Sequence, residues 1–252
     1  MRFFLDISFD GTEYSGWQRQ PKDKSVQQCI EESLSVVFQQ PVEIVGAGRT
    51  DAGVHASHMI AHVDLSDSTD ASALKGKLNM MLPADIAING IARVKDNAHA
   101  RFDAVSRRYR YFVSLSKTPF ERKYSMRLFS MPDVELMNRA ARILLDVTDF
   151  TSFAKLHSDT KTNICHVSKA EWNVLSDGRL EFVIEADRFL RNMVRAIVGT
   201  LLQVGRGKID LEQFVRIIGS KDRCSAGDSV PAAGLFLDQV KYPESVYSDS
   251  VV

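Results

Sequence analysis

Long apolar runs are absent from this 252-residue sequence. A helix needs roughly 20 consecutive apolar residues to cross a bilayer, and no segment approaches that length. The first residues alternate in the manner of a strand and include an early acid, Asp6. They lack the apolar core and the small-residue cleavage site of a secretory signal peptide. These absences predict a cytoplasmic protein that does not enter a membrane.

Cysteine is scarce and widely spaced, with only Cys29, Cys165 and Cys224 in the whole chain. No Cys-x-x-Cys pair is present, which argues against a thiolate zinc site or a dithiol redox motif. We therefore expect reduced thiols with a mainly structural role.

Net charge is also lacking, because 32 basic residues balance 32 acidic residues. This balance does not favour a nucleic-acid-binding protein, since such domains are often strongly basic. The basic residues nevertheless cluster, and a neutral chain can carry a basic cleft. One cluster contains Arg101, Arg107, Arg108 and Arg110, and a second contains Arg188, Arg191 and Arg195.

Periodicity of the apolar residues predicts a mixed chain large enough for one large or two ordinary domains. Alternation predicts strands over 2–10, 42–45, 58–65, 86–95, 107–116, 167–175, 180–186 and 234–240. Helical spacing predicts helices over 25–39, 70–82, 133–145, 190–204 and 211–218. Ser25 and Gln28 suggest a capping box at the start of the first helix. Strands and helices do not alternate strictly, so the fold class is α+β with antiparallel sheets.

The most informative run is GAGRTDAGVHA at residues 46–56. Three glycines surround Arg49 and Asp51, and glycine permits turns and close ligand approach that other residues resist. An arginine near an aspartate keeps the carboxylate ionised and available as a nucleophile. By composition alone, the same run also suits a structured turn with a surface ion pair.

A second run, SRRYRYF at residues 106–112, alternates arginines with aromatic residues on a predicted strand. Strand side chains alternate between faces, so Tyr109, Tyr111 and Val113 share one face. Arg108 and Arg110 lie on the other. An ordinary aromatic core face would give the same pattern.

A third run, FLRNMVRAIVG at residues 189–199, places Arg191 and Arg195 near the start of a predicted helix. Taken alone, it suits a solvated helix.

In this order, the three runs resemble the tRNA pseudouridine synthase family of the TruA type. The resemblance implies that Asp51 is the catalytic residue, that Tyr109 contacts the substrate uracil, and that Arg195 pairs with Asp51. Weaker matches are GWQRQ at 16–20, NAHARF at 97–102 and PAAGLFL at 231–237, whereas 227–230 departs from the family's small-residue pattern. The resemblance extends from the first strand to residue 240.

Further site residues follow from the same resemblance. Arg49 is a candidate to fill the space left by a flipped base, and Leu235 lies on the strand that lines the family's pocket. Candidate RNA-contacting residues are Arg19, Arg101, Arg107, Arg108, Arg110 and Arg188.

The resemblance also implies a fold and a function. It implies two RRM-like or ferredoxin-like α/β halves that share a central antiparallel sheet, and a homodimer. The stretch 117–132 is the candidate boundary in this sequence, so we expect the halves to be 1–116 and 117–252. The implied reaction isomerises uridine to pseudouridine at positions 38, 39 and 40 of the tRNA anticodon arm. Because no electrons or groups enter, no cofactor is required. The partner is tRNA.

Two other functions fit parts of the sequence. Aromatic and basic strands suit a non-catalytic RNA-binding module, although this leaves the loop at 46–56 unexplained. His55, His58 and His62 suggest a metal-dependent hydrolase. On a strand, however, His58 and His62 would lie about 13 Å apart, too far for one ion. No His-Glu-x-x-His motif is present either, so we expect no metal.

Overall fold

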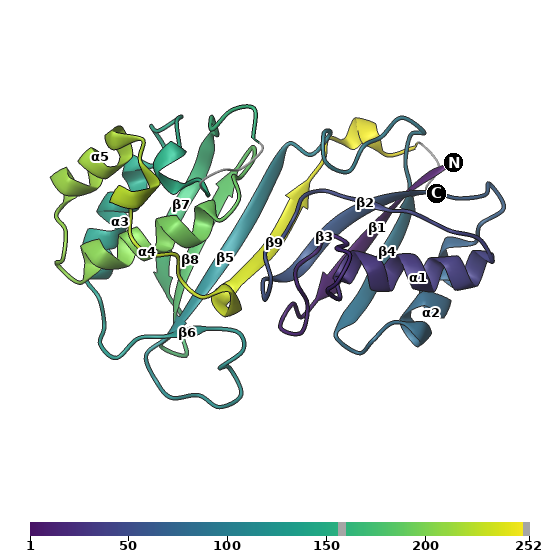
Figure 1. The fold of residues 1–252 in the computed structure, drawn as a ribbon, viewed down its shortest axis with the longest axis horizontal. Coiled ribbons are helices and arrows are strands. Elements are labelled where there is room, and N and C mark those ends of the chain that lie inside the picture. Colours follow the sequence, from purple (N-terminus) through teal and green to yellow (C-terminus); the bar gives the residue numbers. More distant parts are fainter. Residues whose placement is uncertain (156–159, 249–252) are drawn as a thin grey trace. The chain divides into compact units, whose positions relative to one another are not determined.

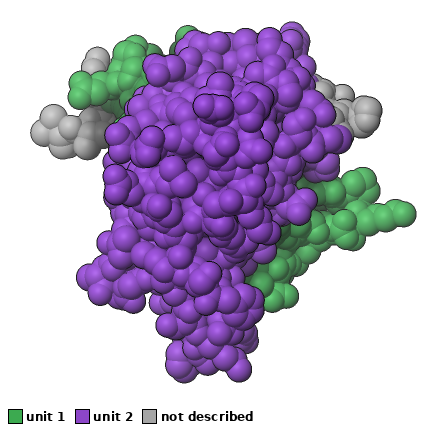
Figure 2. All heavy atoms as spheres, turned by 90° about the vertical axis from the view of Figure 1, so that its left-hand side faces the viewer, with its two compact units in different colours: residues 1–105, 237–252 green, residues 106–236 purple. Residues whose placement is uncertain are grey.

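The structure is a computed structural model that describes residues 1–155 and 160–248. Its contacts divide the chain into two compact units, coloured separately in Figure 2. The first unit contains 1–105 and 237–252, and the second contains 106–236. The expected halves, 1–116 and 117–252, place the domain boundary differently and stay a prediction about domain organisation.

The first unit is built on an antiparallel sheet (Figure 1). Strand β1 (Arg2–Phe9) lies between β3 (His55–Asp64) and β4 (Ile86–Arg93). The two-residue strand β2 (Val45–Gly46) pairs with β3, and β9 (Leu235–Lys241) follows β3 on its other side. The strand order β4-β1-β3-β9 brings the C-terminal strand into the unit formed by the N-terminal residues.

Two helices cover this sheet. Helix α1 (Val26–Phe38) is capped by Ser25, and α2 (Ala71–Met81) is capped by Asp70, whose carboxylate accepts from two backbone N–H groups. Such caps satisfy backbone donors that have no partner within the helix. The helices contact each other, and α2 packs on β4. The buried side chains of this core include Leu5, Ile7, Ile30, Leu34, Met59 and Leu78.

The second unit contains three antiparallel strands in the order β5-β8-β7. These are β5 (Ser106–Ser114), β7 (Val167–Val174) and β8 (Leu180–Ala186), and the short strand β6 (Met126–Arg127) runs parallel to β5. The turn between β7 and β8 contains Gly178 at φ +81°. A positive φ favours glycine, which agrees with the hairpin predicted there.

Helices α3 (Val134–Ile143), α4 (Met193–Gly205) and α5 (Leu211–Ser220) pack against one another in this unit, and α3 also contacts β7. Helix α4 is the most buried of the three, and Ile197, Val198 and Leu201 are fully inaccessible. Short 3-10 helices are η1 (Thr151–Phe153), η2 (Arg223–Ser225), η3 (Ala232–Gly234) and, in the first unit, η4 (Glu244–Val246).

The predicted α+β class is confirmed, and every predicted helix and strand has ends within three residues of the observed bounds. None of the helices in the described ranges is both long and apolar enough to cross a bilayer. The strand predicted at 42–45 nevertheless overlaps β2 at one residue alone, because β2 contains only Val45 and Gly46.

The backbone before β2 is held by helix α1 and not by a neighbouring strand. The N–H of Val42 donates to Ser35 Oγ at 3.0 Å, and the N–H of Ile44 donates to Glu31 Oε1 at 3.2 Å. Both acceptors are side chains of α1, so these backbone donors are satisfied without a sheet partner. Alternation of Val42 and Ile44 therefore reflects burial against a helix.

The predicted capping box at α1 is half present. Gln28 N donates to Ser25 Oγ at 3.3 Å, but the Gln28 side chain turns away and donates to Glu32. A complete capping box occurs at α5, where Asp210 and Gln213 exchange both bonds. A nearby acceptor one turn along the helix thus diverts the Gln28 amide from the cap.

Candidate active site

The loop between β2 and β3 carries Asp51 and is fixed by backbone hydrogen bonds. Ala47 N donates to Ile60 O at 2.7 Å at one end. At the other end, Val54 N donates to Asp51 O at 3.2 Å and closes a tight turn. Gly53 N donates to Tyr14 O at 3.2 Å, and Tyr14 lies in the segment that follows β1. The peptide that bears Asp51 is therefore held at both ends.

The same loop packs directly against Gly16. Gly16 has φ +95°, and a Cβ at this position would lie 2.2 Å from Thr50 O. Trp17 N lies 3.4 Å from that carbonyl oxygen and donates to it. Only glycine fits both the backbone angle and the close approach, so the GWQRQ segment and the Asp51 loop form one substructure.

Arg49 is exposed and Asp51 is half-buried on this loop. Arg49 Nε donates to Gln18 Oε1 at 3.0 Å, which fixes the arginine against the neighbouring segment. Between them, Thr50 is buried, and its hydroxyl has no hydrogen-bond partner among the described residues. The loop thus carries an exposed cation and a half-buried carboxylate on an ordered backbone.

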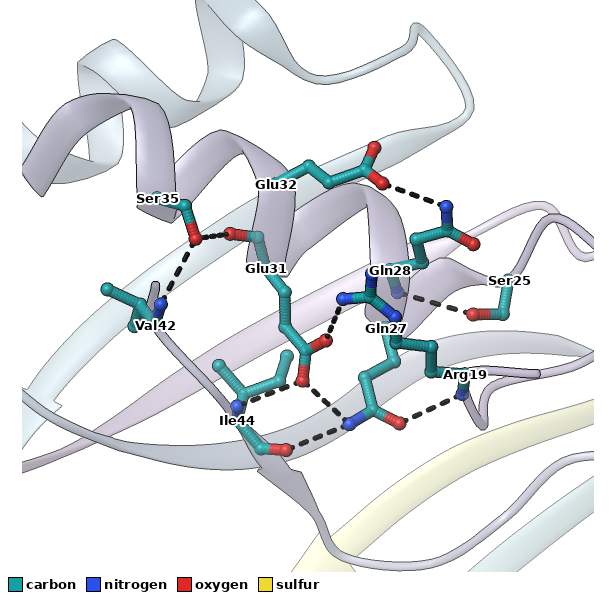
Figure 3. Close-up of polar contacts among 9 residues, drawn as sticks. All are labelled: Arg19, Ser25, Gln27, Gln28, Glu31, Glu32, Ser35, Val42 and Ile44. Atoms are coloured by element: carbon teal, nitrogen blue, oxygen red, sulfur yellow. Dashed lines mark hydrogen bonds and ion pairs between the residues drawn. The ribbon is translucent and has the colours of Figure 1, made fainter. Parts of the chain in front are cut away.

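A buried carboxylate, Glu31, organises the segment that precedes α1 (Figure 3). Glu31 Oε2 accepts from Arg19 Nη1 at 3.1 Å, and its side chain is only 6% exposed. Glu31 Oε1 accepts from Gln27 Nε2 at 2.8 Å and from Ile44 N at 3.2 Å. Burial of a charge is costly unless the charge is paired, and here every contact is a donor.

Gln27 completes this network from the adjacent turn of the helix. Its amide oxygen accepts from the backbone N–H of Arg19 at 3.1 Å, and its amide nitrogen also donates to Ile44 O at 3.0 Å. Both the backbone and the side chain of Arg19 are therefore held by α1 (Figure 3). The Arg19 side chain is 53% exposed, so much of its guanidinium faces solvent.

The three histidines of β3 have structural partners. Each ring accepts a backbone N–H at Nδ1: Gly11 to His55 at 3.1 Å, Val240 to His58 at 3.0 Å, and Ala100 to His62 at 3.1 Å. His55 Nδ1 also lies 3.0 Å from Asp10 Oδ1. Burial, with the nearby charge of Arg2, lowers the pKa of His62 to about 4. In the described part of the chain, no group of three histidines, cysteines or acids is arranged to hold a metal.

Tyr109 lies in the middle of β5, opposite Ile184 of β8. Its ring meets Phe189 edge to face, with centroids 4.9 Å apart, and it is half-buried. The predicted faces are observed, because Tyr111 and Val113 on the same side are fully buried. Tyr109 therefore lies on the same face of β5 as the buried Tyr111 and Val113, but its own side chain is partly accessible.

The arginines of β5 make contacts within the second unit. Arg107 Nη1 donates to Asp187 O at 2.8 Å. Arg110 forms an ion pair with Glu181 and lies 4.9 Å over the Phe112 ring. These contacts fix where the two guanidinium groups lie, and they offset part of the charge of Arg110.

Arg195 lies in the first turn of α4 and is joined to residues that precede η3. Its Nε donates to Val230 O at 2.7 Å, while Val230 N donates back to Arg195 O at 3.2 Å. One turn earlier, Asn192 Nδ2 donates to Ser229 Oγ at 2.6 Å. The stretch 227–230, which departs from the family pattern, is thus bound to α4 beside Arg195.

The remaining candidates occupy varied settings. Arg101 is exposed, with its guanidinium 5.8 Å from the Phe102 ring, and Arg108 and Arg188 are half-buried. Leu235 is 6% exposed at the start of β9. Gly234, just before it, packs so closely on β5 that a Cβ would meet the Phe112 carbonyl oxygen at 2.8 Å.

Within each unit, the structure brings several predicted residues together. Asp51 and Arg49 share the fixed loop that packs on the segment containing Arg19. In the second unit, burial raises the pKa of the Tyr111 hydroxyl, and the charge of Arg195 opposes part of that rise. The pairing of Asp51 with Arg195 joins the two units and stays a prediction.

Sequence reasoning missed the residues that hold these side chains. Gln18, Gln27 and Glu31 support the first unit's loop, and Phe189 packs on Tyr109. One signal was available, because Glu31 is an acid beside Ile30 on the apolar face of a predicted helix. Basic and aromatic groups together with a carboxylate on a fixed loop are features of an enzyme that acts on RNA.

Comparison with known proteins agrees with this class. The sequence profile of a family described as tRNA pseudouridine synthase matches residues 7–103 and 140–243. These stretches cover more than half of the chain. The chain therefore belongs to the tRNA pseudouridine synthase family and is an isomerase that forms pseudouridine in tRNA.

Similar proteins cover nearly the whole chain. A tRNA pseudouridine synthase A of Bacteroides thetaiotaomicron is 53% identical over 250 residues, which span 98% of this chain and 93% of that protein. A tRNA pseudouridine synthase A of Porphyromonas gingivalis is 52% identical over 249 residues, which span 98% of this chain and 99% of that protein. That of Photorhabdus laumondii is 39% identical over 249 residues, which span 96% and 92%.

Proposed function

We propose that this enzyme acts at positions 38, 39 and 40 of the tRNA anticodon arm and that Asp51 is its catalytic residue. The observation that carries the proposal is the setting of Asp51, a half-buried carboxylate on a loop closed by its own backbone carbonyl and packed on Gly16. A reacting group must be held in one geometry, and these contacts provide that order.

The chemistry is an exchange of bonds within one nucleotide. The bond from uracil N1 to ribose C1′ breaks, the base turns, and a bond from C5 to C1′ forms. N1 gains a proton and C5 loses one, so atoms and electrons balance without a cofactor. Asp51 serves this reaction by attacking the uracil ring, by attacking the sugar, or by assisting a glycal intermediate.

Arg195 is proposed to hold Asp51 in its anionic form. A carboxylate that loses water on substrate binding is favoured as the neutral acid unless a cation lies nearby. A guanidinium supplies that charge together with a rigid fork of donors. Its Nε donates to Val230 O at 2.7 Å, which fixes the direction of the guanidinium.

The target base must leave its stack in the RNA, which costs a few kcal/mol. Stacking on the Tyr109 ring returns about 1–3 kcal/mol, so the two terms nearly cancel. Arg49, exposed beside Asp51, is proposed to occupy the space that the base vacates. Leu235 is proposed to line the base pocket.

Contacts to phosphates must supply the remaining affinity. Proposed contributors are Arg19, Arg101, Arg107, Arg108, Arg110 and Arg188. Because such contacts release counterions, binding should weaken steeply as the salt concentration rises. The support is the exposure of Arg19 and Arg101, together with the accessible positions of the others.

The resemblance to the family further supports a homodimer that works in the cytoplasm. Sedimentation equilibrium at micromolar concentration tests the homodimer, and the mass of a monomer would contradict it. Fractionation of the source cells tests the proposed location in the cytoplasm.

One experiment tests substrate, reaction and position together. Unmodified tRNA transcript with uridines at 38–40 is incubated with the enzyme, and pseudouridine is mapped along the RNA. We expect product at these positions and none in a matched transcript with cytidines there. Product only at other positions would contradict the site assignment, and tight binding without product would favour the RNA-binding module.

A further inference from the structure

A pocket of about 460 Å³ lies at the end of β5, in the loop that leads to β6. Figure 1 shows this long connection beside the label of β6. The pocket is outside the residues assigned to the active site. Its lining is made of basic, hydroxyl and proline side chains: Ser114, Ser116, Lys117, Thr118, Pro119, Arg122, Ser125 and Arg127.

The pocket has a strong excess of positive charge. None of the cations Lys117, Arg122 and Arg127 forms an ion pair with a described residue. Glu121 is the one acid between residues 115 and 127, and it lies 3.4 Å from Arg179. No acidic side chain lines the pocket itself. Three cations around a cavity with no acid favour an anionic ligand.

Hydrogen bonds within the loop give the pocket a fixed shape. Ser114 Oγ donates to Ser116 O at 2.9 Å, and Ser125 Oγ donates to Glu121 O at 3.1 Å. Arg122 Nη1 donates to Pro119 O at 2.6 Å, which sets the direction of its guanidinium. Ordering the loop before binding reduces the entropy lost when a ligand is held.

Exposed aromatic side chains accompany this charge. Phe120 is 92% exposed in the same loop, and Phe129, just after β6, is 90% exposed. The Arg127 guanidinium lies 5.0 Å over the Phe129 ring. Cations interleaved with exposed aromatic rings are typical of surfaces that bind single-stranded nucleic acid.

We propose that this pocket binds one backbone phosphate of the tRNA and that Phe120 stacks on a neighbouring unpaired base. The inference rests on the tRNA substrate of the proposed function. Tyr109 and Ser114 lie on the same strand, five residues or roughly 16 Å apart. An RNA whose target base meets Tyr109 is long enough to reach the pocket, so the contact adds affinity away from the reacting base.

The test measures the dissociation constant of a tRNA transcript at several KCl concentrations. Lys117→Ala and Arg127→Ala remove cations that make no ion pair with a described residue, so both variants should fold. Each should weaken binding by on the order of threefold to tenfold and lower the slope of log K against log salt by about 0.7–0.9. Phe120→Ala should weaken binding without changing the slope. Lys208→Ala, an exposed lysine of the same unit, is the matched control.

Unchanged affinity and slope in Lys117→Ala and Arg127→Ala would overturn the phosphate site, and unchanged affinity in Phe120→Ala would overturn the stacking contact. Inorganic phosphate is titrated separately against the wild type. Saturation by free phosphate with no change in tRNA affinity would show a small-anion site and overturn the proposal. Pseudouridine formation by the wild type is followed in parallel, so failure of the proposed function is visible independently of these binding curves.

Discussion

The carboxylate of Glu31 accepts a hydrogen bond from the Arg19 guanidinium at 3.1 Å, and this contact joins a buried helix face to an exposed RNA-facing candidate. Arg19 follows Gln18, which in turn accepts from Arg49 beside Asp51. The position of the Asp51 loop therefore depends on α1 through a short series of side chains. We propose that Glu31 influences RNA binding through Arg19, as a positioning residue.

Glu31→Gln tests this role selectively. The variant retains Oε1 for Gln27 and Ile44, while an amide NH₂ replaces Oε2 and faces the donor group of Arg19. We expect tRNA affinity to fall by about threefold to tenfold, because an unfixed arginine loses more freedom on binding. Fluorescence binding curves with tRNA measure the change.

A double-mutant cycle separates positioning from general damage. In an Arg19→Ala background, Glu31→Gln should cause no further loss of tRNA affinity, since the two residues act as one unit. Additive losses would contradict the proposed link. Urea unfolding of each variant records any change in stability.

Gly16→Ala is expected to destabilise the fold and abolish activity. Alanine at φ +95° is strained, and its Cβ would overlap Thr50 O, which lies 2.2 Å away. Gly178→Ala is the matched control, because Gly178 has φ +81° but open space around the missing Cβ. The free energy of unfolding should fall by about 1 kcal/mol in the control and by at least about 2 kcal/mol more in Gly16→Ala.

Urea denaturation with pseudouridine assays checks both variants. Equal losses of stability in Gly16→Ala and Gly178→Ala would show that the backbone at Thr50 moves to accept the new Cβ at little cost. Retained activity in Gly16→Ala would contradict the close link between this glycine and the Asp51 loop.

The buried ring of His62 predicts a pH dependence of stability. Burial, then Arg2 and His99, lower its pKa from 6.5 to about 4, although Asp64 and Asp103 oppose this. The unfolded chain therefore binds a proton at higher pH than the native protein does. Stability should fall as pH drops from about 6.5 to about 4, with a contribution of about 2–3 kcal/mol.

His62→Asn isolates this contribution. The asparagine side chain has an acceptor for Ala100 N but no group that titrates in this range. Urea midpoints measured between pH 7 and pH 4 should fall less in the variant than in the wild type. Parallel curves for the two proteins would contradict the assignment.

Tyr109 should act mainly through its ring. Tyr109→Phe keeps the ring face that we propose stacks on uracil, so kcat/KM should stay within about threefold of the wild type. Tyr109→Leu removes the stacking, worth about 1–3 kcal/mol, and should lower kcat/KM by roughly tenfold or more. The measurement is kcat/KM for pseudouridine formation on a tRNA transcript by both variants and the wild type. A large loss in the phenylalanine variant would assign a role to the hydroxyl.

Local structure was largely readable from the sequence. Alternation defined β8 at its observed bounds, and helical spacing placed α1 within one residue at each end. The predicted opposite faces of β5 were also observed, with Tyr111 buried. These features depend on the period of side chains along one element, which a sequence contains directly.

Contacts between distant segments were not readable in the same way. The backbone at Val42 and Ile44 bonds to side chains of α1, and alternation alone could not distinguish this from a strand. Gln18 and Val230, whose oxygens accept from Arg49 and Arg195, lie even farther away in the chain, at 31 and 35 residues. Periodicity carries no information about such partners. Their discovery needs coordinates.

Asp51→Asn tests most directly whether Asp51 carries the reaction, as we propose. The variant keeps the side chain's size but cannot supply an anion, and Asp23→Asn, an exposed aspartate, serves as the control. We predict that Asp51→Asn binds tRNA nearly as tightly as the wild type and forms no pseudouridine at positions 38–40, while Asp23→Asn remains active. Pseudouridine at the wild-type rate from Asp51→Asn would contradict the account.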